Sequence, residues 1–209
     1  METIEKEMNR KEIIRQRIRQ MRDALSSAWI NQVSKKIQNR AKNLNEWKKA
    51  NNVCCYLSMP GEVQTQLLIQ EGWTAGKQIC VPAFRKTSGH YELAWLRQGD
   101  KFVSGYGHVP EPIEPDWLET QGPLIQDTEI DTKPCIVDIV IIPGMAFDRS
   151  CARIGRGKGH YDRLLRMDIF NSAFKLGMAF EFQMMDVIPV EAHDVRMDAV
   201  VTEENFDRN

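Results

Sequence analysis

The segment from residue 136 to residue 165 constrains the fold of this chain more than any other. It begins with an apolar run rich in β-branched residues, 136–142, which is typical of a strand covered on both faces, as in a parallel sheet. Pro143 and Gly144 end the predicted strand. A glycine-rich basic stretch follows, and residues 161–165 have the pattern of a first helical turn. The segment therefore predicts a buried strand, a turn, a glycine-rich loop and a helix, in that order.

The loop alternates glycines with cations, at Gly155, Arg156, Gly157, Lys158 and Gly159. Alternating glycines let the backbone bend tightly and turn its N–H groups toward a ligand, and the interleaved cations suit phosphate. The positive end of the following helix also favours an anion. The spacing fits neither a Walker A loop nor a Rossmann fingerprint. The local chemistry predicts a phosphate site, and a flexible basic surface loop is the alternative.

Composition indicates one ordinary globular domain. A length of 209 residues is enough for one substantial core, so we predict a single domain over 1–209. The net charge of −1 provides no global field that would draw the chain to nucleic acid or to an anionic membrane. There is no apolar run of about 18 residues, and the charged N-terminus lacks a signal core, so we predict a cytoplasmic protein with no membrane span. The five cysteines are an odd number without regular spacing, which argues against a disulfide framework. They include no C-x-x-C pair, which argues against a zinc site.

Along the rest of the chain, helical and strand patterns alternate. Helices are predicted over 3–24, 27–44, 64–74 and from 161 to about 167, and strands over 53–57, 78–82, 91–96, 136–142 and 174–180. This alternation predicts an α/β fold with three layers, a mostly parallel sheet with helices on both faces (Rossmann-like). The stretch 99–133 is rich in Gly, Pro and acidic residues, and we predict an ordered excursion on the substrate side, with a disordered insert as the alternative.

Several motifs resemble those of the 5-formyltetrahydrofolate cyclo-ligase family. The central segment contains P-G-x-A-F-D from Pro143 and R-I-G-R-G-K-G-H-Y-D-R-L-L from Arg153. Residues 105–112 resemble the Y-G-x-x-E-P segment of that family, and the C-terminal region resembles its P-x-E-x-H-D-V tail. Two positions depart from the pattern, because Cys151 stands where members often have glycine and His160 where many have tyrosine. The resemblance implies an enzyme that uses ATP and Mg²⁺ to convert 5-formyltetrahydrofolate to 5,10-methenyltetrahydrofolate, releasing ADP and phosphate.

The resemblance implies ATP-binding residues in two places. Lys11 and Arg15 match a K-x-x-x-R motif on the first helix of the family, although a solvated charged stripe is the alternative and is our prediction for Arg19 and Arg22. The other ATP-binding positions lie in the glycine-rich segment: Arg153, Ile154, Gly155, Arg156, Gly157, Lys158, Gly159, His160 and Tyr161.

Arg156 and Lys158 are predicted to be catalytic, because the main task in phosphoryl transfer is to position the reactants and neutralise charge. The positions from Arg156 to His160, including Gly157 and Gly159, are expected to face both ATP and folate, since the transferring phosphoryl group must touch both.

Folate binding is assigned by the same resemblance to the loop after the first strand. Glu62 matches the glutamate of an E-x-x-T motif that binds folate in the family, and a carboxylate suits the N–H donors of a pterin. Met59 is expected to pack on the ring. The alternatives are a helix-dipole contact for Glu62 and plain core packing for Met59. Trp95 and Tyr106 both remain candidates for stacking on the ligand.

The resemblance places Mg²⁺ on Asp162 and Asp194, and Mg²⁺ prefers one or two carboxylates together with phosphate oxygens and water. The alternatives are a helix N-terminal charge for Asp162 and a turn residue for Asp194, and Asp148 is a rival ligand because it follows the strand directly. The expected partners are ATP and 5-formyltetrahydrofolate, with or without a polyglutamate tail. We predict a monomer that binds neither nucleic acid nor membrane.

Two other functions compete with the cyclo-ligase prediction. A sugar-phosphate isomerase or acyl-CoA transferase on a similar sheet would need a general base or a glutamate nucleophile, and would not need Lys11 with Arg15. A non-catalytic relative that binds nucleotide, folate or RNA would be indicated by loss of the loop cations or of Glu62. All of these residues are present, so an ATP-dependent cyclo-ligase is the prediction.

Overall fold

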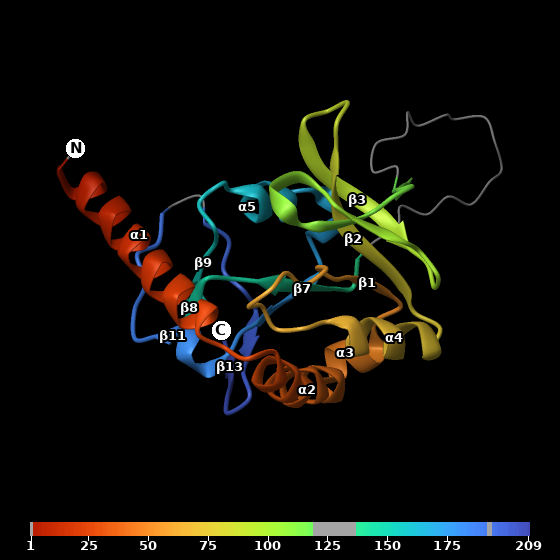
Figure 1. The fold of residues 1–209 in the computed structure, drawn as a ribbon, viewed down its shortest axis with the longest axis horizontal. Helices are drawn as coiled ribbons and strands as arrows, with labels where there is room; N and C mark the ends of the chain where they lie inside the picture. The colour runs from red at the N-terminus through yellow and green to blue at the C-terminus, as the bar shows by residue number, and fades with distance from the viewer. Residues whose placement is uncertain (1, 119–136, 192–193) are drawn as a thin grey trace.

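The computed structural model describes residues 2–118, 137–191 and 194–209 of the chain. Its centre is an eight-stranded sheet with the strand order β13-β12-β10-β7-β1-β2-β3-β6 (Figure 1). In chain order these strands are β1 (Asn52–Cys54), β2 (Gln78–Arg85), β3 (His90–Leu96), β6 (Asp116–Trp117), β7 (Ile139–Pro143), β10 (Phe174–Met178), β12 (Ala199–Val201) and β13 (Phe206–Arg208). The strands from β12 to β2 run parallel, and the edge strands pair antiparallel. The predicted mostly parallel α/β sheet is confirmed.

Alternating side chains along the buried strands build a hydrophobic core on each face of the sheet. On β7, Ile139 and Ile141 join one cluster, whereas Val140 and Ile142 join the cluster on the opposite face. Three helices supply the first cluster: α2 (Ser27–Asn43), α3 (Asn45–Lys49) and α4 (Gln66–Thr74). The short helix α5 (His160–Leu164) and the turn η2 (Asp168–Phe170) supply the second. Helices therefore cover both faces, which gives three layers (Figure 1).

The N-terminal helix α1 (Glu2–Asp23) lies to one side of these layers (Figure 1). Its Ile18 is fully buried in a third cluster together with Met145, Ala146 and Ile154. These partners come from a small sheet of β8 (Ala146–Asp148), β9 (Arg153–Ile154) and β11 (Met184–Met185) and from the turn before it. The packing holds α1 against the start of the glycine-rich segment.

Several predicted boundaries are wrong. The strand predicted over 53–57 ends at Cys54, and the helix predicted to about residue 167 ends at Leu164. In the second case the chain turns at once to bury Phe170 completely in the core, and tertiary packing overrides local pattern. Inside the predicted excursion the structure has an ordered hairpin, β4 (Phe102–Ser104) and β5 (Pro110–Pro112), with the turn η1 (Tyr106–His108) between them. Residues 119–133 of that stretch lie outside the described residues.

The cysteines within the described ranges are buried free thiols: Cys54, Cys55, Cys80 and Cys151. Across the same ranges, the chain has no helix that combines the length and the apolar composition needed to cross a bilayer.

Candidate active site

A cavity of about 740 Å³ opens at the carboxyl ends of β1 and β7. Tyr56 and Leu57 follow β1, and Gly144 and Met145 follow β7, and all four line the cavity. This is the edge where open α/β sheets bind ligands. The structure also brings to it every residue assigned above to ATP, folate or magnesium: Lys11, Arg15, Met59, Glu62, Arg153, Ile154, Gly155, Arg156, Gly157, Lys158, Gly159, His160, Tyr161, Asp162 and Asp194. Their individual roles stay predictions.

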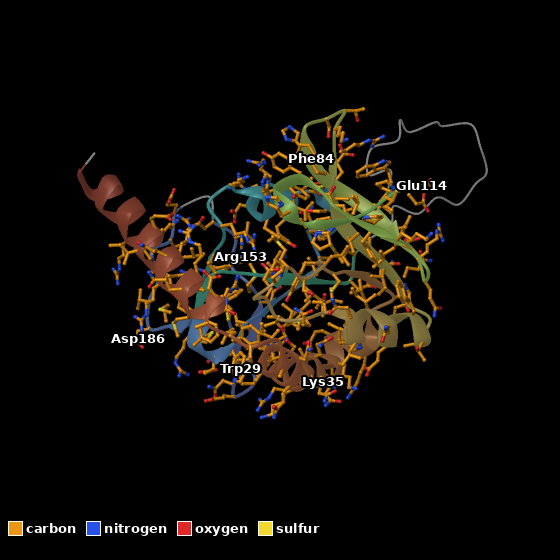
Figure 2. All side chains as sticks on the ribbon, viewed as in Figure 1. Trp29, Lys35, Phe84, Glu114, Arg153 and Asp186 are labelled. Atoms are coloured by element: carbon orange, nitrogen blue, oxygen red, sulfur yellow. The ribbon has the colours of Figure 1, made fainter. Side chains whose placement is uncertain are left out.

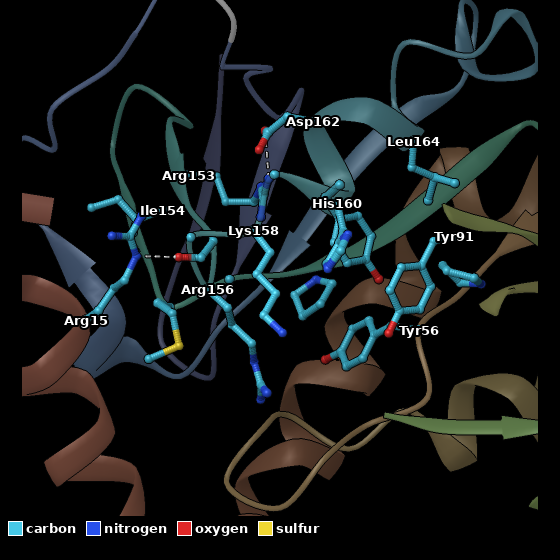
Figure 3. A pocket seen from close by; sticks show the side chains of 18 of the residues that line it. Arg15, Tyr56, Tyr91, Arg153, Ile154, Arg156, Lys158, His160, Asp162 and Leu164 are labelled. Atoms are coloured by element: carbon cyan, nitrogen blue, oxygen red, sulfur yellow. Dashed lines mark hydrogen bonds and ion pairs between the residues drawn. The ribbon is translucent and has the colours of Figure 1, made fainter. Parts of the chain in front are cut away.

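The glycine-rich loop joins β9 to α5 and meets α1 across the cavity (Figure 3). Gly157 and Gly159 have φ angles of +95° and +62°, in the left-handed region that favours glycine. A Cβ atom on Gly157 would lie 3.4 Å from Cζ of Arg15. Arg15 also donates from Nε to the carbonyl oxygen of Gly155 at 2.9 Å. The first helix therefore delivers its arginine directly to the loop, although 140 positions separate them.

Most of the cations that line the cavity are already paired with carboxylates. The pairs are Lys11 with Glu191 (2.7 Å) and Asp194 (2.9 Å), Arg15 with Glu12 (3.2 Å), Arg153 with Asp162 (2.9 Å) and Arg156 with Glu62 (2.9 Å). Lys158 has no carboxylate at ion-pair distance within the described part of the chain, and its Nζ lies 5.0 Å from the centre of the Tyr106 ring. Figure 3 shows Lys158 and Arg156 extending into the cavity side by side. A polyphosphate that enters the cavity could therefore bind the paired cations only if they release their carboxylates.

The surroundings shift the pKa values of two cavity residues, Lys11 and His160, in opposite directions. Burial lowers the pKa of Lys11, but its hydrogen bonds to Glu191 and Asp194 outweigh that effect and raise the pKa above the ordinary value. Burial, with the nearby charges of Arg163 and Lys158, lowers the pKa of His160, so its imidazole is neutral at neutral pH. Nδ1 of His160 lies 3.0 Å from an Arg163 nitrogen that can only donate, which assigns the ring hydrogen to Nε2.

The flat walls of the cavity come from tyrosines that the sequence analysis missed. Tyr56 donates from its hydroxyl to Val63 at 2.7 Å, and Tyr91 donates to the carbonyl of Tyr106 at 2.8 Å. Burial, with the Glu111 charge, raises the pKa of Tyr91 to about 12, so the phenol stays neutral. Neither of the two stacking candidates lines the cavity. Trp95 packs on the core, and the Tyr106 ring stacks on the Phe84 ring with 4.2 Å between the ring centres. The one signal in the sequence was the place of Tyr56 at the carboxyl end of a strand.

The sequence profile of the 5-formyltetrahydrofolate cyclo-ligase family matches residues 7–203 of the chain. The chain belongs to this family. A Schizosaccharomyces pombe protein named probable 5-formyltetrahydrofolate cyclo-ligase is 32% identical, over 79% of this chain and 81% of the relative. The 5-formyltetrahydrofolate cyclo-ligase of Haemophilus influenzae is 30% identical, over 87% and 91%. The solved structure of 5,10-methenyltetrahydrofolate synthetase from Aquifex aeolicus superposes with a TM-score of 0.75 at 29% identity, covering 95% of this chain and 92% of that one.

Magnesium, which the family resemblance implies, finds suitable donors in the cavity. Asp162 and Asp194 both line it, and carboxylates are among the hard oxygen ligands that Mg²⁺ prefers. Glu191, to which no role was assigned from the sequence, pairs with the same Lys11 ammonium group as Asp194. Among the described residues, no group of three or more His, Cys, Asp or Glu side chains could hold a metal by itself. Two carboxylates would match the ligands of Mg²⁺ only if phosphate oxygens and water supplied the others.

Asp148, the rival metal ligand, is committed elsewhere. Its side chain is buried and accepts hydrogen bonds from the Ser150 backbone and hydroxyl, from the Ala152 backbone and from the Ile188 backbone. These bonds fix the turn between β8 and β9 and leave the carboxylate facing the protein, so Asp148 stabilises a turn and does not line the cavity.

For Arg22, in the last turn of α1, the prediction of a solvated side chain is wrong. Arg19 is exposed and pairs with Glu12, as expected, but Arg22 is only 8% exposed. The guanidinium of Arg22 donates to the carbonyl oxygen of Gly144 at 2.6 Å. The cause is tertiary, because the last turn of α1 packs on the loops that follow β1 and β7.

Proposed function

We propose that this chain converts 5-formyltetrahydrofolate and ATP to 5,10-methenyltetrahydrofolate, ADP and phosphate. Membership of the cyclo-ligase family and the names of its relatives support the reaction. The observation that carries the proposal for this site is the 2.9 Å ion pair between Arg156 of the glycine-rich loop and Glu62 of the loop after β1. A residue expected at the phosphates and a residue expected at the pterin are within contact distance, as a phosphoryl transfer between two substrates requires.

The chemistry has to overcome the low reactivity of an N-formyl group. Its nitrogen lone pair is delocalised into the carbonyl, and its oxygen is a poor leaving group. In the proposed reaction the formyl oxygen attacks the γ-phosphorus of ATP, and the bond from that phosphorus to ADP breaks. N10 of the folate then attacks the activated carbon and loses its proton, and phosphate departs with the former formyl oxygen. Such a reaction needs positioning and charge neutralisation and no covalent enzyme intermediate.

The residues of the cavity divide between these tasks. Lys11, Arg15 and Arg153 are assigned to the phosphates of ATP, together with the backbone N–H groups of the glycine-rich loop. Arg156 and Lys158 are assigned to the transferring phosphoryl group, since they extend into the cavity from the same loop (Figure 3). Glu62 accepts from the pterin, and Met59 packs on its ring. The Nε2 atom of His160 is buried and has no hydrogen-bond partner among the described residues, so a donation to a ligand oxygen would require the ring to turn.

Mg²⁺ belongs to the proposal as the ion held by Asp162 and Asp194. When bound it would supply positive charge to the phosphate oxygens. Lys11 and Arg153 now neutralise these carboxylates, and their ammonium and guanidinium groups would then be released toward phosphate. We also propose that the chain acts as one domain and as a monomer in the cytoplasm, on small molecules alone.

A mixing experiment tests the reaction. Purified protein is combined with 5-formyltetrahydrofolate, ATP and Mg²⁺, and the near-ultraviolet absorption of the methenyl product is followed. We expect the band to grow only when all three are present, with one ADP formed for each methenyl product. A flat trace in the complete mixture, with ATP still bound in a calorimetric titration, would favour a non-catalytic binding protein and contradict the proposal.

A further inference from the structure

Arg22 is a buried guanidinium that lies behind the cavity and outside its lining. It sits in the last turn of α1 and donates to Gly144 at the end of β7, at 2.6 Å. It also lies within 3.5 Å of the Met145 sulfur. Its Nε is buried and has no hydrogen-bond partner within the described part of the chain. A buried charge without full pairing is costly, so its position requires another source of compensation.

That compensation comes from Glu62. One nitrogen of Arg22 lies 3.8 Å from Oε1 of Glu62, and both side chains are almost completely buried. This separation allows attraction between the charges, yet it is longer than a hydrogen bond. Oε1 therefore keeps its capacity to accept a hydrogen bond from another group. The backbone of the loop that carries Glu62 also packs closely on Arg22. Gly61 has a φ of +77°, and a Cβ atom there would lie 3.2 Å from Cβ of Arg22.

The other contacts of Glu62 differ in permanence. Oε2 accepts from the backbone N–H of Met59 at 3.0 Å, within the same tight loop. Oε1 accepts from Arg156, whose side chain is 47% exposed and belongs to the loop that faces the cavity. A polyphosphate in the cavity would compete with Glu62 for this exposed guanidinium, whereas the buried Arg22 has no route to such a ligand. Two guanidiniums thus share one carboxylate, one fixed and one exchangeable.

We infer that Arg22 is a positioning residue for Glu62, a fixed counter-ion that holds the carboxylate in its folate-binding place when Arg156 turns to the phosphates. The inference rests on the proposed function, in which Glu62 accepts from the pterin. It predicts that loss of Arg22 weakens folate binding and leaves ATP binding largely intact, although Arg22 touches neither substrate.

The test compares Arg22→Met with Arg17→Met, which removes an exposed charge from the same helix. KM for each substrate is measured, and folate binding is titrated by calorimetry in the presence of a non-hydrolysable ATP analogue, which would draw Arg156 away from Glu62. We expect Arg22→Met to raise the KM for 5-formyltetrahydrofolate about tenfold. The KM for ATP should change less than about twofold, because Arg22 acts through Glu62, which is assigned to folate and not to ATP. Arg22→Lys keeps the charge without the planar guanidinium, so a rise of about threefold is expected. Arg17→Met should leave both values unchanged.

A double-mutant cycle separates positioning from general structural damage. In a Glu62→Gln background, Arg22→Met should add little to the folate KM, because the group it positions is already changed. Full additivity, equal rises in both KM values, or no change would overturn the inference. If Arg22→Met does not fold, the KM values of Arg22→Lys for folate and for ATP are compared in the same way.

A wild-type protein that binds folate but forms no product refutes the proposed function. The calorimetric comparison of folate binding by the Arg22 variants then tests the role of Arg22 alone. Absence of folate binding overturns both.

Discussion

Lys158 and Arg156 stand two positions apart on one loop, yet their surroundings differ. Arg156 is held by Glu62, whereas Lys158 lies over the Tyr106 ring with no carboxylate beside it in the described structure. Lys158 is therefore the cation that can bind a phosphate without first giving up an ion pair. This makes it the sharpest single-residue test of the loop.

We expect Lys158→Ala to lower kcat/KM by about 10²–10³-fold, as removal of a charge-stabilising donor does elsewhere. The thermal unfolding midpoint should stay unchanged, because the side chain is exposed and the ring below it, Tyr106, is exposed as well. Steady-state kinetics and a melting curve measure the two effects. Lys35→Ala, on the outward side of α2 (Figure 2), is the matched control and should retain full activity. Normal turnover by the Lys158 variant would remove the loop lysine from the chemistry.

At the scale of elements, the ion pairs of Lys11 join α1 to the segment that precedes β12. Glu191 and Asp194 both accept from its ammonium group, from positions 180 and 183 residues away. The same segment carries Asp194, a proposed magnesium ligand, so a metal bound there would compete with Lys11 of the first helix for this carboxylate.

Asp194→Asn should raise the Mg²⁺ concentration that gives half-maximal activity by about tenfold or more, because an amide is a weaker ligand for a hard cation. Titration of activity with Mg²⁺ at saturating ATP measures it. Asp186→Asn, an exposed aspartate of the same region (Figure 2), should give the wild-type curve. Identical curves for all three proteins would exclude Asp194 from the metal site.

The hairpin β4–β5 is tied to β2 by Glu111, which is 8% exposed and accepts from the Phe84 backbone at 3.2 Å. Burial raises the pKa of this carboxyl above its ordinary 4.5. A carboxyl that holds its proton more tightly in the folded state favours folding below the unfolded pKa, and this contribution is lost as the pH rises through the folded pKa. The window for this loss begins near pH 4.5 and extends upward.

Glu111→Gln keeps an acceptor for the backbone and cannot ionise. We expect the variant and the wild type to differ little in free energy of unfolding below pH 4.5, and the variant to gain on the wild type as the pH rises above that value. Urea unfolding at several pH values measures the difference. Glu114→Gln, on an exposed position of the same region (Figure 2), should show no such trend. A pH-independent difference for Glu111→Gln would show that its carboxyl titrates normally.

At the scale of the whole molecule, Phe147 connects the eight-stranded sheet to the small sheet of β8, β9 and β11. It lies on β8 of the small sheet, is fully buried, and packs so closely on the main sheet that a Cβ atom on Gly177 would come within 2.7 Å of its ring. Gly144, after β7, meets the same ring. The ring thus fixes the small sheet, and with it the start of the glycine-rich segment, against the main sheet.

Phe147→Ala should lower the free energy of unfolding by about 3–5 kcal/mol, the usual cost of deleting a buried aromatic ring. Phe102→Ala removes a ring that is 46% exposed and should change the free energy by less than about 0.5 kcal/mol. Denaturant unfolding with an unchanged m-value measures both. Equal effects of the two substitutions would contradict the role of Phe147 in joining the sheets.

The sequence by itself determined the alternation of strands and helices, the α/β class, the family and the glycine-rich loop. These features follow from local patterns: strand side chains alternate with period 2, helical ones recur every 3.6 residues, and glycines mark the backbone turns. The candidate site residues could be named because they lie within short motifs, and the structure places all of them around one cavity.

Only the tertiary structure decided which charges are buried and which partners they meet. Arg22 and Arg19 belong to the same charged stripe, and nothing in their local pattern separates them. Yet Arg22 is buried against Gly144, 122 positions away, while Arg19 remains in solvent. The tyrosine walls of the cavity and the structural role of Asp148 were decided in the same way. The physical reason is that burial and ion pairing depend on contacts between distant segments, which exist only after the chain has packed.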